Sequence, residues 1–167
     1  SVPLFYLYSK RSAGIGDFQD LGLIIEWAKA TGQSIVQLLP MNEMGPFNCP
    51  YDAISSFALE PAYITLDNLV TPALVPRLQE LKRKFPAGKP HVDYSIKQAK
   101  IALLQEVFMG QKVEQDTGFK KYIKENSYWL EDFALYKAIK EFHKGKPWYG
   151  WEESLSNRDE SALRSFK

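Results

Sequence analysis

The sequence predicts an α/β fold that opens with a strand–helix–strand unit and continues as a series of helices. Two observations carry this prediction. Residues 35–39 form a short, largely apolar segment between Gly32 and Pro40, which is typical of a strand buried on both faces. From Val70 onward the apolar residues recur at helical spacing instead.

The opening unit is predicted from residues 2–8 onward. These residues are apolar and aromatic, and we interpret them as the first strand. The following helix is expected to begin at Asp17, which suits the cap position, and to end at Gly32. One apolar face is spaced i, i+3, i+4 and i+7: Leu21, Ile24, Ile25 and Ala28. Because a helix connects the two strands, as in a βαβ unit, we expect parallel neighbouring strands with this face packed on them.

The later elements are predicted from helical periodicity and from Pro and Gly breaks. Residues 53–59 are interpreted as a short helical or turn segment, and residues 62–66 as an extended piece. Helices are expected over residues 72–85, with a start as late as Pro76, and over 95–110, 119–125 and 126–143. The helix over residues 95–110 is expected to bury a stripe of Ile96, Leu103 and Val107. The helix over residues 126–143 is expected to bury Leu130, Phe133, Ala134 and Ala138.

Composition limits the classes of function. The 167 residues are 45% hydrophobic and carry a net charge of +1, which gives no reason to expect a nucleic acid or a membrane surface as partner. No apolar segment approaches the roughly 20 residues that cross a bilayer, and residues 1–5 do not resemble a signal peptide. A single cysteine, Cys49, excludes an internal disulfide and favours a cytoplasmic location. Aromatic residues make up 14%, which suits a packed core or a sugar-binding groove.

The loop at residues 41–56 is the first place to look for function. Loops at the carboxyl ends of parallel strands bind ligands in α/β folds. Tyr51 is the candidate for binding, and a ring packed under the loop is the alternative of equal weight. Glu43 and Asp52 share the loop and are candidates for the carboxylate pair of glycosyl chemistry, although loop carboxylates are usually solvated.

Other motifs argue against cofactor and metal chemistry. Residues 14–16, Gly-Ile-Gly, suggest a dinucleotide loop, but Gln19 occupies the third glycine position, so a tight turn is expected. His91 and His143 lie far apart without further ligands at suitable spacing, and we expect no zinc or other metal. Cys49 has no nearby histidine and is interpreted as a loop thiol rather than a nucleophile.

An ordered series of short motifs indicates a family. The series is Gly14-Ile15-Gly16-Asp17-Phe18, Trp27-Ala28-Lys29, Gln37-Leu38-Leu39-Pro40, Pro50-Tyr51, Ser56-Phe57-Ala58 and, later, Trp129-Leu130-Glu131-Asp132-Phe133-Ala134-Leu135 with Pro147-Trp148. It resembles the start of the 4-alpha-glucanotransferases, the amylomaltase or disproportionating-enzyme family, and the helical insertion after their second barrel strand. The opening motifs alone would also fit the wider α-amylase clan.

The resemblance implies a (β/α)8 TIM barrel that acts on maltooligosaccharides and other α-1,4-glucans with retention. A carboxylate nucleophile, a Glu acid/base and a third carboxylate lie on later barrel strands of the family, and no position here matches them. A barrel takes about 250 residues. We therefore expect an amino-terminal fragment: an incomplete barrel over residues 1–69 and a mostly helical insertion over residues 70–167, without catalytic residues of its own.

The resemblance also implies binding residues in the loop. Tyr51 matches a family tyrosine that lines the sugar site beside the cleaved bond. Asn48 and Cys49 match polar positions before it, where the family more often has Asp and Ser. Pro46 falls near an aromatic that some members use at a secondary glucan site, and this departure argues against such a site. Two alternatives stay open: a hydrolase of the α-amylase clan, and a non-catalytic helical or glucan-binding module.

Overall fold

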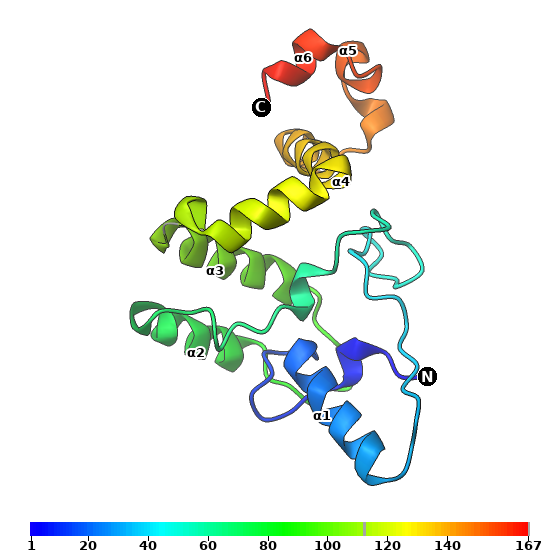
Figure 1. Cartoon of the computed structure of the whole chain (residues 1–167), viewed down its shortest axis with the longest axis vertical. Helices are drawn as coiled ribbons and strands as arrows, with labels where there is room; N and C mark the ends of the chain where they lie inside the picture. The colour runs from blue at the N-terminus through cyan, green and yellow to red at the C-terminus, as the bar shows by residue number, and fades with distance from the viewer. Residues whose placement is uncertain (112, 167) are drawn as a thin grey trace. The chain divides into compact units, whose positions relative to one another are not determined.

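The computed structural model describes residues 1–111 and 113–166 and divides the chain into two compact units. The N-terminal unit spans Ser1–Lys112 and the C-terminal unit spans Val113–Lys167. In Figure 1 they are the blue-to-green and the yellow-to-red parts of the ribbon. Among the described residues, no helix has both the length and the apolar character that crossing a bilayer requires.

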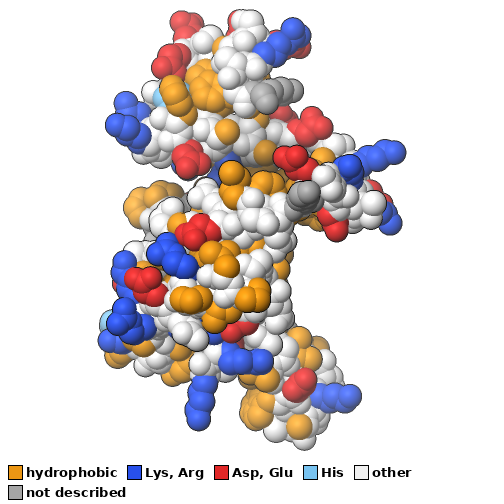
Figure 2. Space-filling view, turned by 90° about the vertical axis from the view of Figure 1, so that its left-hand side faces the viewer, with side chains coloured by type: hydrophobic (Ala, Val, Ile, Leu, Met, Phe, Trp, Pro, Cys, Tyr) orange, Lys and Arg blue, Asp and Glu red, His pale blue; other side chains and the backbone are white. Residues whose placement is uncertain are grey.

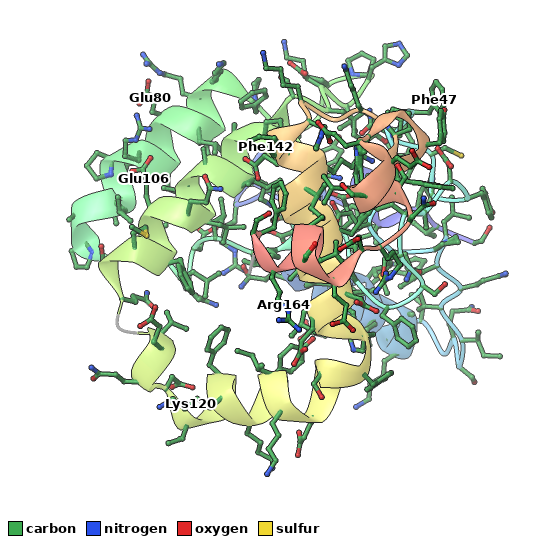
Figure 3. The ribbon with its side chains drawn as sticks, turned by 90° about the horizontal axis from the view of Figure 1, so that it is seen from above. Phe47, Glu80, Glu106, Lys120, Phe142 and Arg164 are labelled. Carbon is green, nitrogen blue, oxygen red and sulfur yellow. The ribbon has the colours of Figure 1, made fainter. Side chains whose placement is uncertain are left out.

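The N-terminal unit is helical where it is regular. Its elements are the 3-10 helices η1 (Leu4–Tyr6), η2 (Pro61–Tyr63) and η3 (Pro72–Leu74) and the α-helices α1 (Phe18–Ala30), α2 (Val75–Lys84) and α3 (Ile96–Gly110). Helices α2 and α3 lie side by side, and Arg77 joins them through an ion pair of 3.0 Å to Glu106 (Figures 1 and 3).

Helix α1 begins and ends where the sequence predicts. The Asp17 carboxylate accepts hydrogen bonds from the amides of Gln19 (2.9 Å) and Asp20 (3.3 Å), and the Asp20 carboxylate accepts one from the Asp17 amide (3.1 Å). This reciprocal capping satisfies donors that a helix start otherwise leaves unpaired. At the other end Gly32 has a φ of +75°, the left-handed conformation that glycine tolerates.

The two predicted strands are wrong as strands, since the described residues form none. Residues 2–8 contain η1 instead, because Pro3 has no N–H to donate and Leu7 donates back to Leu4 (3.0 Å). One parallel bridge joins Val2 to Leu38, with the Val2 amide 2.8 Å from the Gln37 oxygen. The predicted parallel neighbourhood is thus confirmed at one position. A strand needs several consecutive backbone pairings with a neighbour, and the described residues supply one isolated bridge at this place.

The apolar face of α1 is only partly covered. Ala28 is buried and Leu21 is half-buried, but Ile25 is 51% exposed, contrary to prediction. Ile25 lines a groove together with Ile35, which is 83% exposed. Ile25 was expected to pack on the two strands and Ile35 to lie within the second of them, and both are exposed in the structure.

The Gly-Ile-Gly motif is a tight turn packed against η1. The Gly16 amide donates to the Phe5 oxygen (3.3 Å). A Cβ at Gly16 would lie 1.9 Å from the Leu7 oxygen and 2.0 Å from the Leu4 oxygen, so only glycine fits this approach. Ile15 is buried in the core, which explains the motif without a nucleotide.

The core of the N-terminal unit joins its helices to its loops. It contains Leu4, Ala13, Ile15, Met44, Ala62, Tyr63, Leu66, Leu78, Leu81, Phe85, Ile96 and Leu103. The predicted stripe of α3 is therefore confirmed, and the extended piece predicted at residues 62–66 is wrong in part, because Pro61 starts η2 there. The predicted division at residues 69 and 70 refers to the barrel of the family and stays a prediction.

The C-terminal unit is organised by one long helix. Its elements are η4 (Val113–Gln115), α4 (Thr117–Phe142), η5 (Trp148–Gly150), α5 (Glu153–Ser156) and α6 (Glu160–Arg164). The break expected between residues 125 and 126 is absent, because α4 continues through both residues. The side-chain amide of Asn126 donates to the Tyr122 oxygen one turn earlier (2.9 Å). Ile139 is the buried residue of α4, whereas Ala134 and Ala138 are exposed, contrary to prediction. The Tyr136 ring lies beside the Trp151 ring in a tilted arrangement (5.7 Å between centroids, 41° between planes), so the segment after the helix covers this face of α4.

His143 provides a pH-dependent tie in this unit. Its Nδ1 lies 2.8 Å from the Ile139 oxygen and its Nε2 lies 2.7 Å from a Glu152 carboxylate oxygen. The ring stacks on Trp151 with 5.5 Å between centroids. Both neighbours are acceptors, so only the protonated ring donates to both, and these hydrogen bonds raise the pKa of His143 above its ordinary 6.5.

Because the pKa of His143 is raised in the folded state, its protonation stabilises this unit. The stabilisation is fully present below about pH 6.5 and is lost as pH rises through the raised pKa. We expect the stability of the C-terminal unit, measured by tryptophan-detected unfolding, to decrease from pH 5.5 to 8.5. His143→Gln should remove this pH dependence. In an NMR titration, Glu152→Gln should lower the pKa of His143. A wild-type pKa at or below 6.5 would refute the prediction.

Candidate functional site

The loop at residues 41–60 folds back on itself as two paired segments. Antiparallel bridges join Asn42 to Leu59 and Met44 to Ala53. Between them, the Ile54 amide donates to the Glu43 oxygen (2.9 Å) and the Glu43 amide donates to the Ala58 oxygen (2.8 Å). We call residues 45–52 the loop tip, since they lie beyond the last bridge.

The loop tip is closed by its own backbone. The Gly45 amide donates to the Asp52 oxygen (2.7 Å), the Asn48 amide to the Gly45 oxygen (3.1 Å) and the Asp52 amide to the Cys49 oxygen (2.9 Å). Asn48 has a φ of +51°, a left-handed conformation in which asparagine is the best tolerated residue after glycine. Two consecutive turns thus give the tip a defined shape.

The loop tip presents aromatic rings to solvent. Tyr51 is 74% exposed, so its ring does not pack under the loop, whereas Asn48 and Cys49 are half-buried. Phe47 is 84% exposed and points outward in Figure 3. Sequence reasoning singled out Tyr51 and did not consider Phe47, although its aromatic ring directly after Pro46 in the same loop was a usable signal.

The two candidate carboxylates of the loop are not brought together. Glu43 is buried, with its Oε1 3.6 Å from the Nζ of Lys97. Asp52 is exposed, and its Oδ2 lies 2.7 Å from where a Cβ on Gly45 would be. One carboxylate serves an ion pair and the other sits over the loop tip, so the structure does not support them as an acid/base pair.

A buried ion cluster lies at the base of the loop. The Lys97 ammonium, from α3, donates to Glu60 Oε2 (2.9 Å) and to the Met44 oxygen (3.3 Å). Glu60 is fully buried, and its carboxylate also accepts from the amides of Met44 (2.9 Å) and Ala62 (3.2 Å). Sequence reasoning missed both residues. Lysines placed beside the apolar stripe of α3 were the one available signal.

A second lysine of α3 holds η2. Lys100 is buried, and its ammonium donates to the Ala62 oxygen at 2.6 Å. Burial lowers the pKa of Lys100 from 10.5 to about 8, although the charges of Asp17, Asp20 and Asp67 favour its protonated form. Lys97 therefore connects α3 to the loop, whereas Lys100 connects α3 to η2, which follows the loop.

Two tyrosines beside the loop base stay protonated at neutral pH. Burial raises the pKa of Tyr63, with smaller effects from Tyr94 and Glu60. Burial also raises the pKa of Tyr94, with smaller effects from Tyr6, Glu60 and Cys49. Neither phenol is thus prepared to act as a base. In the part of the chain that the structure describes, no three His, Cys, Asp or Glu side chains gather as metal ligands.

Figure 2 shows basic and acidic side chains interspersed with apolar ones on the face that it presents. On this face the distribution agrees with the net charge of +1.

Comparisons with known proteins place the chain in a family. A family model described as 4-alpha-glucanotransferase matches residues 2–167. The 4-alpha-glucanotransferase of Chlamydia pneumoniae is 33% identical over 166 residues, which cover 95% of this chain and 31% of the relative. That of Aquifex aeolicus is 35% identical over 154 residues, covering 90% and 30%. The chain therefore spans about a third of the length of these two curated relatives.

Solved structures agree with this placement. An amylomaltase from Corynebacterium glutamicum is 22% identical, with a TM-score of 0.75 over 98% of this chain and 25% of that one. An amylomaltase from Streptococcus agalactiae in complex with acarbose is 19% identical, with a TM-score of 0.73 over 99% and 34%. At these identities the likeness concerns the fold. Because the family model covers residues 2–167, the chain belongs to the 4-alpha-glucanotransferase family.

Proposed function

We propose that this chain works within a longer 4-alpha-glucanotransferase, which moves α-1,4-glucan segments between maltooligosaccharides with retention. We also propose that the loop tip forms part of its sugar-binding surface. The family match over residues 2–167 supports the activity. The exposed ring of Tyr51, on a loop tip closed by its own hydrogen bonds, is the observation that carries the binding role.

The chemistry assigns different tasks to this chain and to the rest of the enzyme. A retaining mechanism needs two carboxyl groups about 5–5.5 Å apart across the scissile bond. Glu43 is engaged with Lys97, so we place the nucleophile and the acid/base outside these residues. Tyr51 is assigned stacking on a pyranose face beside the cleaved bond, and Asn48 and Cys49 are assigned contacts to sugar hydroxyls.

The proposal covers ligands and location too. The Streptococcus agalactiae amylomaltase was solved with acarbose, which suits an oligosaccharide site in the family. We propose maltooligosaccharides as partners, without nucleic acid, membrane or cofactor. The single cysteine supports a cytoplasmic location.

Tyr51→Ala is expected to lower the efficiency of maltotriose disproportionation by the full-length enzyme about ten- to a hundredfold, or about 1–3 kcal/mol. The stacking surface is lost, whereas Tyr51→Phe retains the ring and should cost less. Tyr149, 75% exposed in the C-terminal unit, offers a matched control, and Tyr149→Ala should leave efficiency unchanged. Wild-type efficiency in Tyr51→Ala, with an unchanged melting temperature, would remove Tyr51 from the site.

The 167-residue chain alone is expected to yield no product from maltotriose, because one carboxylate of its candidate pair, Glu43, is buried against Lys97, whereas the other, Asp52, is exposed on the loop tip. Chromatography of the sugars after prolonged incubation measures this, with the full-length enzyme as the positive control. Product that persists in the Glu43→Gln/Asp52→Asn variant would show that other residues of this chain perform the chemistry.

A further inference from the structure

We infer that Lys97 is a positioning residue for the proposed sugar site: from α3 it holds the base of the loop and thereby sets the orientation of Tyr51. The inference rests on the proposed binding role of the loop tip. It adds to that role a residue 46 positions away in the sequence, which no loop motif would indicate.

Met44, the last residue before the loop tip, is held at both of its backbone polar groups. Its amide donates to Glu60 (2.9 Å), and its oxygen accepts from the Lys97 ammonium (3.3 Å). The Lys97–Glu60 pair, at 2.9 Å, closes a ring of three interactions. Since the Met44 side chain is buried as well, this residue has little freedom to move.

The position of Met44 determines the position of the loop tip. Met44 bridges Ala53 on one side of the tip, and its neighbour Gly45 donates to Asp52 (2.7 Å). Tyr51 directly precedes Asp52, so the Met44–Ala53 bridge and the Gly45–Asp52 hydrogen bond both restrict its backbone. A site fixed in this way loses less conformational entropy on binding than a mobile loop does.

Charge explains why a lysine is needed at this point. Glu43 and Glu60 are both buried, and Lys97 lies within 3.6 Å and 2.9 Å of their carboxylates. Removing the ammonium leaves two buried carboxylates close together, where desolvation and mutual repulsion both favour opening toward water. The loop base, rather than a distant part of the unit, would open.

Hydrogen exchange in the 167-residue chain tests the positioning. We expect Lys97→Met to speed exchange at the amides of Met44, Gly45 and Ile54 by about tenfold or more, with α1 amides unchanged. Lys97→Arg, which keeps the charge, should stay closer to wild type. Lys100→Met is the matched control, because that buried lysine of the same helix bonds Ala62 and not the loop base. Unchanged exchange in Lys97→Met overturns the inference.

Maltotriose affinity of the same chain, measured by NMR titration, tests the link to Tyr51. In the wild-type background, Lys97→Met should weaken binding about tenfold. In the Tyr51→Ala background, the same substitution should weaken binding only slightly. A merely structural effect would give additive losses, and additivity or an unchanged affinity also overturns the inference. Absence of wild-type binding counts against the proposed sugar site instead, and the exchange experiment then decides the role of Lys97 in the loop by itself.

Discussion

Replacing Glu60 by alanine is expected to lower the free energy of unfolding of the N-terminal unit by about 3–5 kcal/mol. Glu60 is fully buried, pairs with Lys97 at 2.9 Å and accepts from two backbone amides, of Met44 and Ala62. Its removal takes this carboxylate away from the Lys97 ammonium and from the buried N–H groups of Met44 and Ala62. Glu43, 3.6 Å from Lys97, retains part of the charge compensation, so we expect the lower end of this range.

Urea unfolding followed by circular dichroism measures this loss. Glu80→Ala is the matched control, because Glu80 is exposed on α2 and pairs with Arg77 at 3.6 Å. Exposed pairs contribute about 0–1 kcal/mol, so this control should remain close to wild type. Equal stabilities of the Glu60 and Glu80 variants would show that the cluster at the loop base contributes little to the fold.

The N-terminal unit is expected to become more stable as pH rises from 7 to 9.5, and Lys100 is the cause. Its pKa is about 8 in the folded state against 10.5 ordinarily, so the unfolded chain binds more protons between these values. Stability therefore increases with pH in this window. The full difference corresponds to roughly 3 kcal/mol, of which about 2 kcal/mol should be gained by pH 9.5.

Lys100→Met removes the titrating group and should abolish the increase. Urea unfolding at pH 7 and 9.5 gives the comparison, and measurements stay below pH 10. Above that value the raised pKa of Tyr63 acts in the opposite direction, since the unfolded chain then loses its phenol proton first. A wild-type unit whose stability is flat or falling from pH 7 to 9.5 would contradict the assignment.

Local features were predictable because they depend on neighbouring residues. Asp17 and Gly32 bound α1 through hydrogen bonds and a φ value that the residue types themselves favour. The stripe of Ile96, Leu103 and Val107 is buried as expected, since periodicity alone defines a helix face. The family, too, was readable from ordered motifs, and the family model covers the same residues.

Predictions that needed partners distant in the sequence failed or stayed partial. Residues 35–39 are apolar enough for a strand, but strand formation depends on pairing, and the described chain offers one bridge at Leu38. Ala134 and Ala138 have the spacing of a buried face, yet packing of Trp151 against Tyr136 turns a different side of α4 inward. Apolar periodicity predicts that a helix has an apolar face, but it does not predict which part of the chain packs on that face.

The sequence by itself determined the family, the limits of α1 and α3, and the loop in which to look for a sugar site. Tertiary structure alone decided where each loop residue lies. It exposes Tyr51, buries Glu43, and brings Lys97 to Glu60 across 37 positions of sequence. The physical reason is that desolvation and ion pairing depend on distance in space, and a linear pattern contains no such distance until the chain has folded.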